Sequence, residues 1–116
     1  MTTYYVDGLV GSDTNDGLAE GAGPVGSPVG SPIPSGAFKT IQKAIDASFT
    51  TGDAYDNRIY VKNNTTYSGD IQLKNDGANY FLKGDSIMGY SDTPGDNGVV
   101  TIDATGCTYG FYSTSI

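Results

Sequence analysis

Short runs of alternating apolar and polar residues characterise much of the chain. Ile59 and Val61 alternate with Tyr60, and Ile71 and Leu73 flank Gln72. A period of two is typical of a β-strand with one buried face. Short strands are therefore predicted at 2–6, 58–62, 70–74, 79–84, 86–90, 98–104 and 109–113.

A helical pattern stands out between residues 38 and 50. Its apolar residues recur at the spacing of one helix face, with polar residues between them. The apolar stripe consists of Ile41, Ala44, Ile45 and Phe49. Thr40 is the expected N-cap, because its hydroxyl can accept a hydrogen bond from the first turn. We expect this helix to cover one apolar surface.

A Gly/Ser/Pro-rich segment, residues 19–37, separates an N-terminal strand and turn (residues 1–18) from the helix. Proline lacks a backbone donor and glycine costs backbone entropy, so the segment is predicted to form a long exposed loop or arm. It is long enough to reach a neighbouring subunit, which favours a role in assembly; a plain surface loop is the alternative.

The strand lengths favour a mostly β fold, in which residues 58–116 form the first coils of a parallel solenoid. Strands of three to five residues at irregular spacing fit a solenoid better than a sandwich. Ile59 and Ile87, like Ile71 and Ile102, are about one coil apart. Because stacked repeats generally need about three units, we expect a longer β-helix or a stack completed by neighbouring subunits.

Charge and composition exclude several classes of function. Six basic and thirteen acidic residues give a net charge of -7, which disfavours nucleic-acid binding. There is no histidine, and the single Cys107 cannot form an internal disulfide or a zinc site. The sequence predicts no membrane insertion, no signal peptide and no cofactor.

Four blocks follow one another along the chain: "YYVDGLVGSDTNDGL", "FKTIQKAID", "IYVKNNTTYSGDIQL" and "IMGYSDTPGDNGVVTIDA". Together they resemble the N-terminal region of right-handed parallel β-helix proteins of the pectate-lyase-like superfamily. That family includes polysaccharide lyases, glycoside hydrolases, surface proteins and phage tailspikes or fibres. The chain departs from the family pattern in its long arm, in Ala37 where proline is usual, and in "NNTTY".

The resemblance implies a right-handed parallel β-helix whose open N-terminal end is capped by the helix. From it we expect a structural or adhesion module of a virion surface protein, located on a virion or outside cells. Trimeric assembly, contacts with other virion proteins and polysaccharide contact are also implied. Two alternatives stay open: a polysaccharide lyase or glycosidase with downstream catalytic coils, and a bacterial surface carbohydrate-binding protein.

Glycan cleavage needs two carboxylates in different environments, a few ångströms apart. The candidates are Asp85, Asp92, Asp96 and Asp103. Their spacing singles out no pair, and Asp92 and Asp96 in "SDTPGD" are expected to accept backbone hydrogen bonds in a turn. No catalytic residue is therefore assigned, and whether the whole protein is an enzyme stays open.

Exposed tyrosines could serve as sugar-stacking platforms, although a half-buried β core also explains them. The candidates are Tyr4, Tyr5, Tyr60, Tyr67, Tyr80, Tyr90, Tyr109 and Tyr112. Asn63 and Asn64 each begin a glycosylation acceptor, for which a polar turn is the simpler interpretation.

The loop "VGSDTNDGL" carries three oxygen-rich side chains, Asp13, Asn15 and Asp16. An EF-hand pattern that starts at Asp13 fails after two ligands, because Gly17 and Pro24 stand where ligands are needed. A turn that reverses the chain is the expected structure. A looser calcium site on the same three residues is the open alternative, and no metal ligand is assigned.

Overall fold

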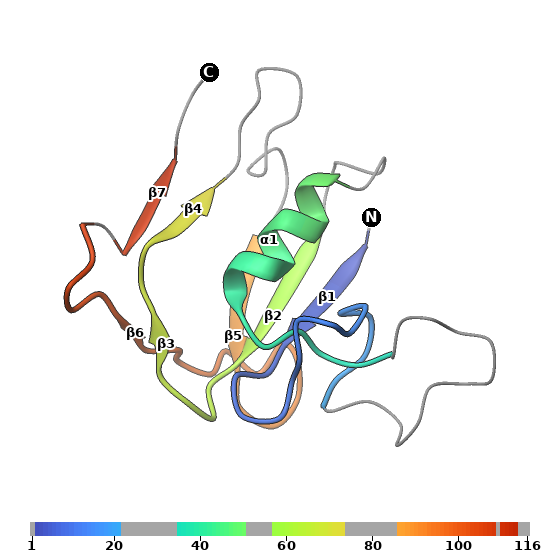
Figure 1. Cartoon of the computed structure of the whole chain (residues 1–116). Coiled ribbons are helices and arrows are strands. Elements are labelled where there is room, and N and C mark those ends of the chain that lie inside the picture. Colours follow the sequence, from blue (N-terminus) through green and yellow to red (C-terminus); the bar gives the residue numbers. More distant parts are fainter. Residues whose placement is uncertain (1, 22–34, 51–56, 74–85, 109, 114–116) are drawn as a thin grey trace.

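The computed structural model describes residues 2–21, 35–50, 57–73, 86–108 and 110–113. These residues form one helix and seven strands (Figure 1). The elements are β1 (Thr3–Val6), α1 (Ile41–Thr50), β2 (Arg58–Lys62), β3 (Tyr67–Ser68), β4 (Ile71–Leu73), β5 (Ser86–Tyr90), β6 (Ile102–Asp103) and β7 (Phe111–Ser113).

Every strand pair in the described residues is parallel. The first layer consists of β2, β3 and β4, and the second layer consists of β5, β6 and β7. The two layers pair strand by strand: β2 with β5, β3 with β6, and β4 with β7. β1 adds a third strand to the sheet on the other side of β2. The second layer therefore lies directly against the first. Side chains at paired positions of the two layers lie next to each other.

Alternation along the strands separates the inside from the outside, as the sequence predicts. In β2 the side chains of Ile59 and Val61 are buried, whereas Tyr60 between them is half-buried. Val6 of β1 is fully buried beside Val61, its partner in register. The core thus lies between β1, the first layer and α1, and its buried members are Tyr4, Val6, Phe38, Ile41, Ala44, Ile45, Ile59, Val61, Tyr67 and Ile71.

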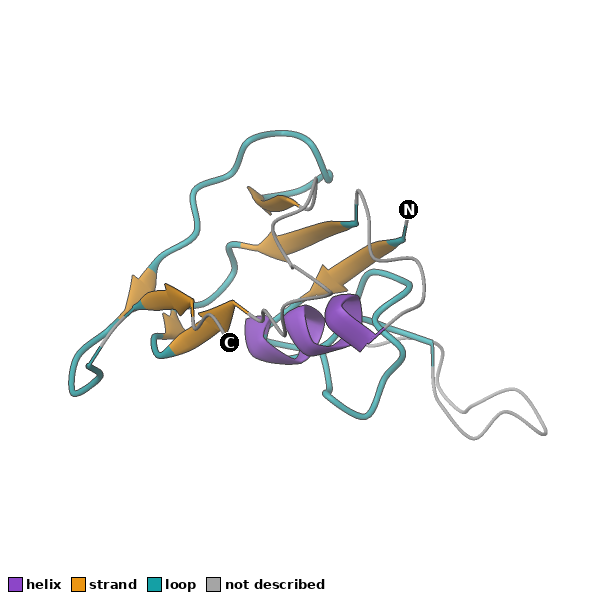
Figure 2. Ribbon diagram, turned by 90° about the horizontal axis from the view of Figure 1, so that it is seen from above, coloured by secondary structure: helices purple, strands orange, loops and turns teal. Residues whose placement is uncertain are grey.

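Helix α1 covers one side of this core. It packs against β1, β2 and β4, and it runs along one side of the strands in both views (Figures 1 and 2). Ile41, Ala44 and Ile45 are buried, which confirms the predicted apolar stripe at these positions. Burial of this face, not intrinsic propensity, stabilises so short a helix.

The helix begins at Ile41, directly after the predicted N-cap Thr40, so Phe38 and Lys39 of the segment predicted at 38–50 lie outside it. Phe38 instead forms a parallel bridge with Val6, and its backbone N–H donates to Tyr5 O at 2.9 Å. The extended bridge is incompatible with helical backbone at Phe38. Thr40 is the N-cap as predicted, because its Oγ1 accepts a hydrogen bond from Lys43 N at 3.3 Å.

Several strands are shorter than the alternation suggests. The strand predicted at 98–104 is reduced to β6, and those predicted at 70–74 and 109–113 are reduced to β4 and β7. β3 was not expected, because its two residues are too few to show a period. The strand predicted at 79–84 and most of the arm lie outside the described residues.

The two ends of the arm lie side by side. Ala37 N donates to Gly21 O at 2.8 Å, and Gly17 N donates to Gly36 O at 2.8 Å. Gly17 has a φ of 75°, a left-handed conformation that favours glycine, and Phe38 fills the space where a Cβ would stand. The described ends are therefore fixed to the body of the protein.

Candidate functional site

Asp13 in the opening loop binds the start of α1. Its Oδ1 accepts hydrogen bonds from Lys39 N at 2.9 Å and Thr40 N at 3.0 Å, and its Oδ2 accepts one from Thr40 Oγ1 at 2.8 Å. A carboxylate at this end of a helix satisfies free N–H groups and complements the helix dipole. No sequence pattern indicates this role, because Asp13 is far from the helix along the chain.

Asn15 and Asp16 also bind backbone groups. Asn15 is buried and donates through Nδ2 to Ala37 O at 2.8 Å. Asp16 Oδ1 accepts from Leu18 N at 2.9 Å, an Asx-turn as expected, and from Gly36 N at 3.3 Å. The loop therefore clamps the end of the arm to the rest of the protein. Among the described residues, no three His, Cys, Asp or Glu side chains are grouped so that they could hold a metal ion.

Asp7 is a buried carboxylate that the sequence analysis did not single out. Its Oδ1 accepts from Leu9 N and Val10 N at 3.0 Å each and from Asn64 Nδ2 at 2.8 Å. Burial raises the pKa of Asp7, but these hydrogen bonds and the charge of Lys62 outweigh burial and hold the pKa below its ordinary value. Asn64 of the glycosylation motif is thus a structural partner of Asp7.

Two of the candidate acid/base carboxylates, Asp96 and Asp103, accept hydrogen bonds within their own turns. Asp96 accepts hydrogen bonds from the N–H groups of Ser91, Asp92, Thr93 and Gly98, which lower its pKa to about 2. Of the other three candidates, the structure describes Asp92 and Asp103. Asp103 accepts a hydrogen bond from Thr105 N, and the Thr105 side chain together with this N–H holds the pKa of Asp103 below its ordinary value. Asp92 is exposed, and Asp85 lies outside the described residues.

The described tyrosines pack mainly on protein. Tyr5 and Tyr60 are stacked with centroids 5.9 Å apart, and Tyr90 contacts Tyr60 edge-on at 6.3 Å. Tyr60 therefore has a ring on two sides. Tyr4 stacks on Phe38, and Tyr67 donates through its hydroxyl to Lys62 O at 2.6 Å. Among the described tyrosines, Tyr4, Tyr67 and Tyr90 are buried, and Tyr5 and Tyr60 are half-buried. The side chains of Tyr80, Tyr109 and Tyr112 are not described.

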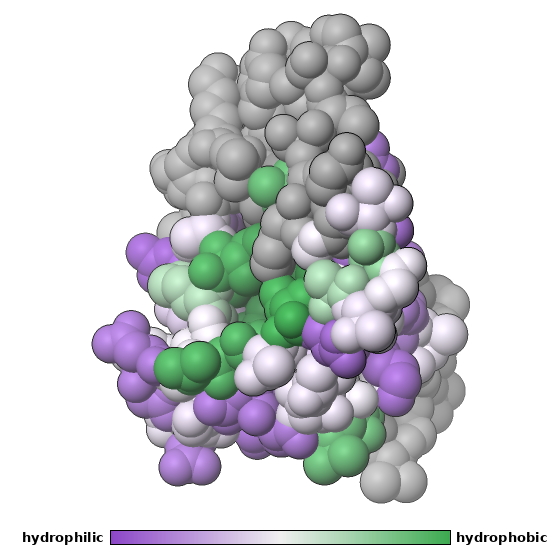
Figure 3. Space-filling model, turned by 90° about the vertical axis from the view of Figure 1, so that its left-hand side faces the viewer, coloured by the Kyte–Doolittle hydropathy of each residue, from purple (hydrophilic) through white to green (hydrophobic). Residues whose placement is uncertain are grey.

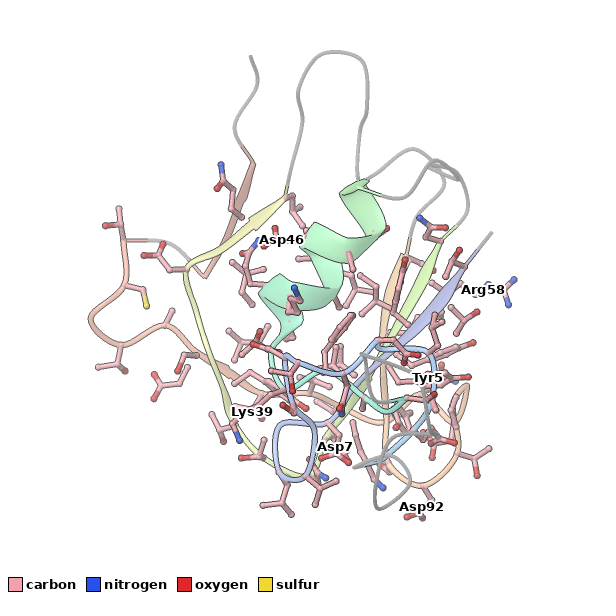
Figure 4. The ribbon with its side chains drawn as sticks, turned by 45° about the vertical axis from the view of Figure 1, so that its right-hand side comes forward. Tyr5, Asp7, Lys39, Asp46, Arg58 and Asp92 are labelled. Atoms are coloured by element: carbon pink, nitrogen blue, oxygen red, sulfur yellow. The ribbon has the colours of Figure 1, made fainter. Side chains whose placement is uncertain are left out.

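A hollow of about 370 Å³ lies beside the start of α1. Lys39 and the first helical residues form one wall, and residues 65–71, which contain β3 and the corner before β4, form the other. Gly8 closes one end, where it packs so tightly on Thr65 and Tyr67 that a Cβ would overlap them. Figure 4 shows Lys39 near the start of α1 and apart from Asp92 and Arg58.

A second cavity, which is apolar and has a volume of about 220 Å³, lies between the start of α1 and strands β2, β5 and β6. It is lined by Ile41, Val61, Ile87, Gly89, Val100 and Ile102. The second-layer residues of this set are only partly buried. Hydrophobic surface is visible on the side of the molecule that carries β4 and β7 (Figure 3).

Parallel pairing of successive short strands, with one covering helix, describes this part of the chain. A scan against protein-family models and searches of curated proteins and of solved structures found no significant match. Within the described residues, no helix is long and apolar enough to cross a membrane.

Proposed function

We propose that the chain is a structural module: the N-terminal cap of a right-handed parallel β-helix in a virion surface protein, such as a phage tailspike or fibre. In this proposal, α1 closes one end of the stack. The opposite end receives further coils or a neighbouring subunit.

One observation carries the proposal: the two ends of the strand stack differ. At one end, on the side of α1, Tyr4 and Val6 of the end strand β1 are buried. At the positions in register in the second layer, Ile87 is only half-buried and Gly89 provides no side chain. An apolar interior with unpaired parallel strand edges favours association with another strand layer.

The resemblance to β-helix proteins supplies the setting of a virion surface, trimeric assembly and glycan contact. The absence of an evident acid/base pair among the described carboxylates agrees with a structural role in this segment.

Self-association tests the capping role. We expect the isolated chain to associate reversibly in sedimentation velocity over a wide concentration range, because the open end buries apolar surface when it is covered. Val100→Lys, which puts a charge at the apolar cavity, should abolish association. Val99→Lys is the matched control, because the side chain of Val99 is 80% exposed.

A wild-type chain that stays monomeric at every concentration would count against an open stacking end. Equal effects of Val99→Lys and Val100→Lys would place the association elsewhere.

A further inference from the structure

The turn that follows β5 contains Asn97 and Gly98, the one asparagine–glycine step in the sequence. Asparagine is chemically labile, most of all before glycine, because glycine has no side chain to shield the next backbone nitrogen. The side chain of Asn97 is exposed and makes no hydrogen bond with any described residue. Its amide is therefore free to react.

The reaction at such a step is deamidation, a ring closure within the main chain. The backbone nitrogen of Gly98 loses its proton and attacks Asn97 Cγ. The bond from Cγ to the side-chain nitrogen then breaks, and ammonia leaves after taking up a proton. Water opens the resulting succinimide at either of its two C–N bonds, which gives aspartate or isoaspartate at this position. The reaction needs no reagent other than water.

The Asp96 carboxylate opposes the first step of this reaction. Its Oδ1 accepts a hydrogen bond from Gly98 N at 3.1 Å. Ring closure needs the deprotonated nitrogen within about 3–3.5 Å of Asn97 Cγ. The hydrogen bond favours the protonated nitrogen, and the negative carboxylate opposes a second negative charge beside it. Because the pKa of Asp96 is lowered to about 2, the carboxylate is also a weak base for the Gly98 proton.

The backbone of the turn is fixed as well. Asp96 also accepts from three other N–H groups of the turn, those of Ser91, Asp92 and Thr93. Gly98 packs so tightly on the backbone of Tyr90 and Ser91 that a Cβ would overlap them. Asn97 has a φ of 60°, a left-handed conformation that asparagine tolerates. The peptide group between Asn97 and Gly98 therefore has little room to rotate towards the Asn97 side chain.

We propose that Asn97 is a site of spontaneous deamidation, and that the Asp96 carboxylate holds the reaction back while the turn is folded. Opening of the turn releases Gly98 N and starts the reaction. The proposal concerns the chemistry of one turn and does not depend on the capping role.

Modification would lengthen the main chain of the turn. In isoaspartate the chain passes through the side-chain carbon, so one methylene group is added. The segment that follows includes Val100, which lines the apolar cavity, and Thr101, whose O accepts from Tyr67 N at 3.0 Å. We expect isoaspartate to shift this segment and to weaken the pairing of the second layer with β3.

Mass spectrometry of the full chain over time tests the site. The folded protein and the protein unfolded in guanidinium chloride are kept at the same mildly alkaline pH, because deprotonation of the nitrogen starts the reaction. Peptide mapping locates the added mass and separates aspartate from isoaspartate. We expect modification at Asn97, about tenfold or more slower in the folded chain than in the unfolded chain.

Asp96→Ala should raise the rate in the folded protein towards that of the unfolded chain, because Gly98 N loses its acceptor. Asp96→Asn keeps an oxygen acceptor without the charge, so its rate should lie between the two. Asp92→Ala removes an exposed carboxylate of the same turn and is the matched control. Asp13→Ala weakens the start of α1 instead and is the control for general destabilisation. Both controls should react at the wild-type rate.

The proposal is overturned if folded and unfolded wild-type chains react at the same rate, or if the added mass maps to another asparagine. Equal rates for Asp96→Ala and Asp92→Ala would also overturn it. Circular dichroism shows whether each variant is folded. If Asp96→Ala does not fold, Asp96→Asn takes its place in this comparison, and a rate equal to that of Asp92→Ala overturns the role of Asp96.

Asn97→Gly provides a second check on the assignment. Glycine adopts the same left-handed backbone without strain, so this variant should fold and should lose the modification. Modification that persists in Asn97→Gly would overturn the assignment to Asn97.

Discussion

The first and second layers have matching registers but unequal burial. Ile59 and Ile87 are partners, and so are Tyr67 and Ile102. The first member of each pair is buried, whereas the second is half-buried. The difference arises because β1 and α1 cover one side of the first layer and the second layer covers the other. Burial here depends on the neighbours in the stack as much as on the pattern within a strand.

The largest expected effect comes from truncating the same residue type in each layer. Ile59→Ala should lower the free energy of unfolding by about 3–4 kcal/mol, because it leaves a cavity in a closed core. Ile87→Ala should cost about 1–2 kcal/mol, because its side chain already contacts solvent on one side. Urea unfolding of both variants measures the difference.

Equal losses of unfolding free energy for the two variants would contradict the difference in burial between the two layers. If a larger assembly that covers the open end is available, the cost of Ile87→Ala should rise towards that of Ile59→Ala. That change would connect the comparison to the proposed capping role.

The alternation of Ile59, Tyr60 and Val61 predicted a strand at 58–62, and β2 has these bounds in the structure. The prediction was possible because the period of two is a local property of a half-buried strand. Nothing local distinguishes Ile59 from Ile87, since their difference depends on which layer packs outside each. β3 was missed because two residues cannot show a period.

The candidate site illustrates the same limit. Asp13 looks like a turn residue in the sequence, and its long-range contact with the start of α1 appears only in the fold. Asp70 has no sequence motif, and its place beside Lys39 depends on how α1 lies against the first layer. The sequence shows the chemistry of each residue, but it does not show which residues distant in the chain lie together in the fold.

The next effect concerns two asparagines at opposite ends of the first-layer strand β2. Asn57 is fully buried, and it accepts from Thr2 N at 2.9 Å and donates to Ser48 Oγ at 2.9 Å. Asn57→Ala should lower the free energy of unfolding by about 2–3 kcal/mol, because it leaves buried partners unsatisfied.

Asn63→Ala is the matched control, and it should cost about 1 kcal/mol or less. Asn63 is half-buried and makes one side-chain bond, to Ser91 Oγ of the second-layer turn at 2.9 Å. Thermal and urea unfolding compare the two variants. A larger loss for Asn63→Ala would reverse the expected order of the two regions.

A smaller effect is expected at the start of α1, which closes the first layer. Asp13→Ala should destabilise the protein by about 1 kcal/mol, because Lys39 N and Thr40 N lose their acceptor. Asp92→Ala, on the turn after the second-layer strand β5, removes an exposed carboxylate and should change stability little. Urea unfolding at neutral pH separates the two, and indistinguishable midpoints would argue against Asp13 as a helix-start residue.

The smallest effect is a pH dependence that differs between a buried carboxylate and an exposed one. The pKa of Asp7 is lower in the folded than in the unfolded chain, because its hydrogen bonds outweigh its burial. Its contribution to stability is therefore fully present above the unfolded pKa of about 4, and it is lost as the pH falls through the folded pKa. Asp7→Asn should reduce the loss of stability below pH about 4, measured by urea unfolding at stepped pH. Asp96→Asn should do so over a range that extends from about pH 4 down to its folded pKa of about 2. If both variants follow the wild-type pH profile, the hydrogen bonds to these carboxylates do not contribute to stability in the way the structure indicates.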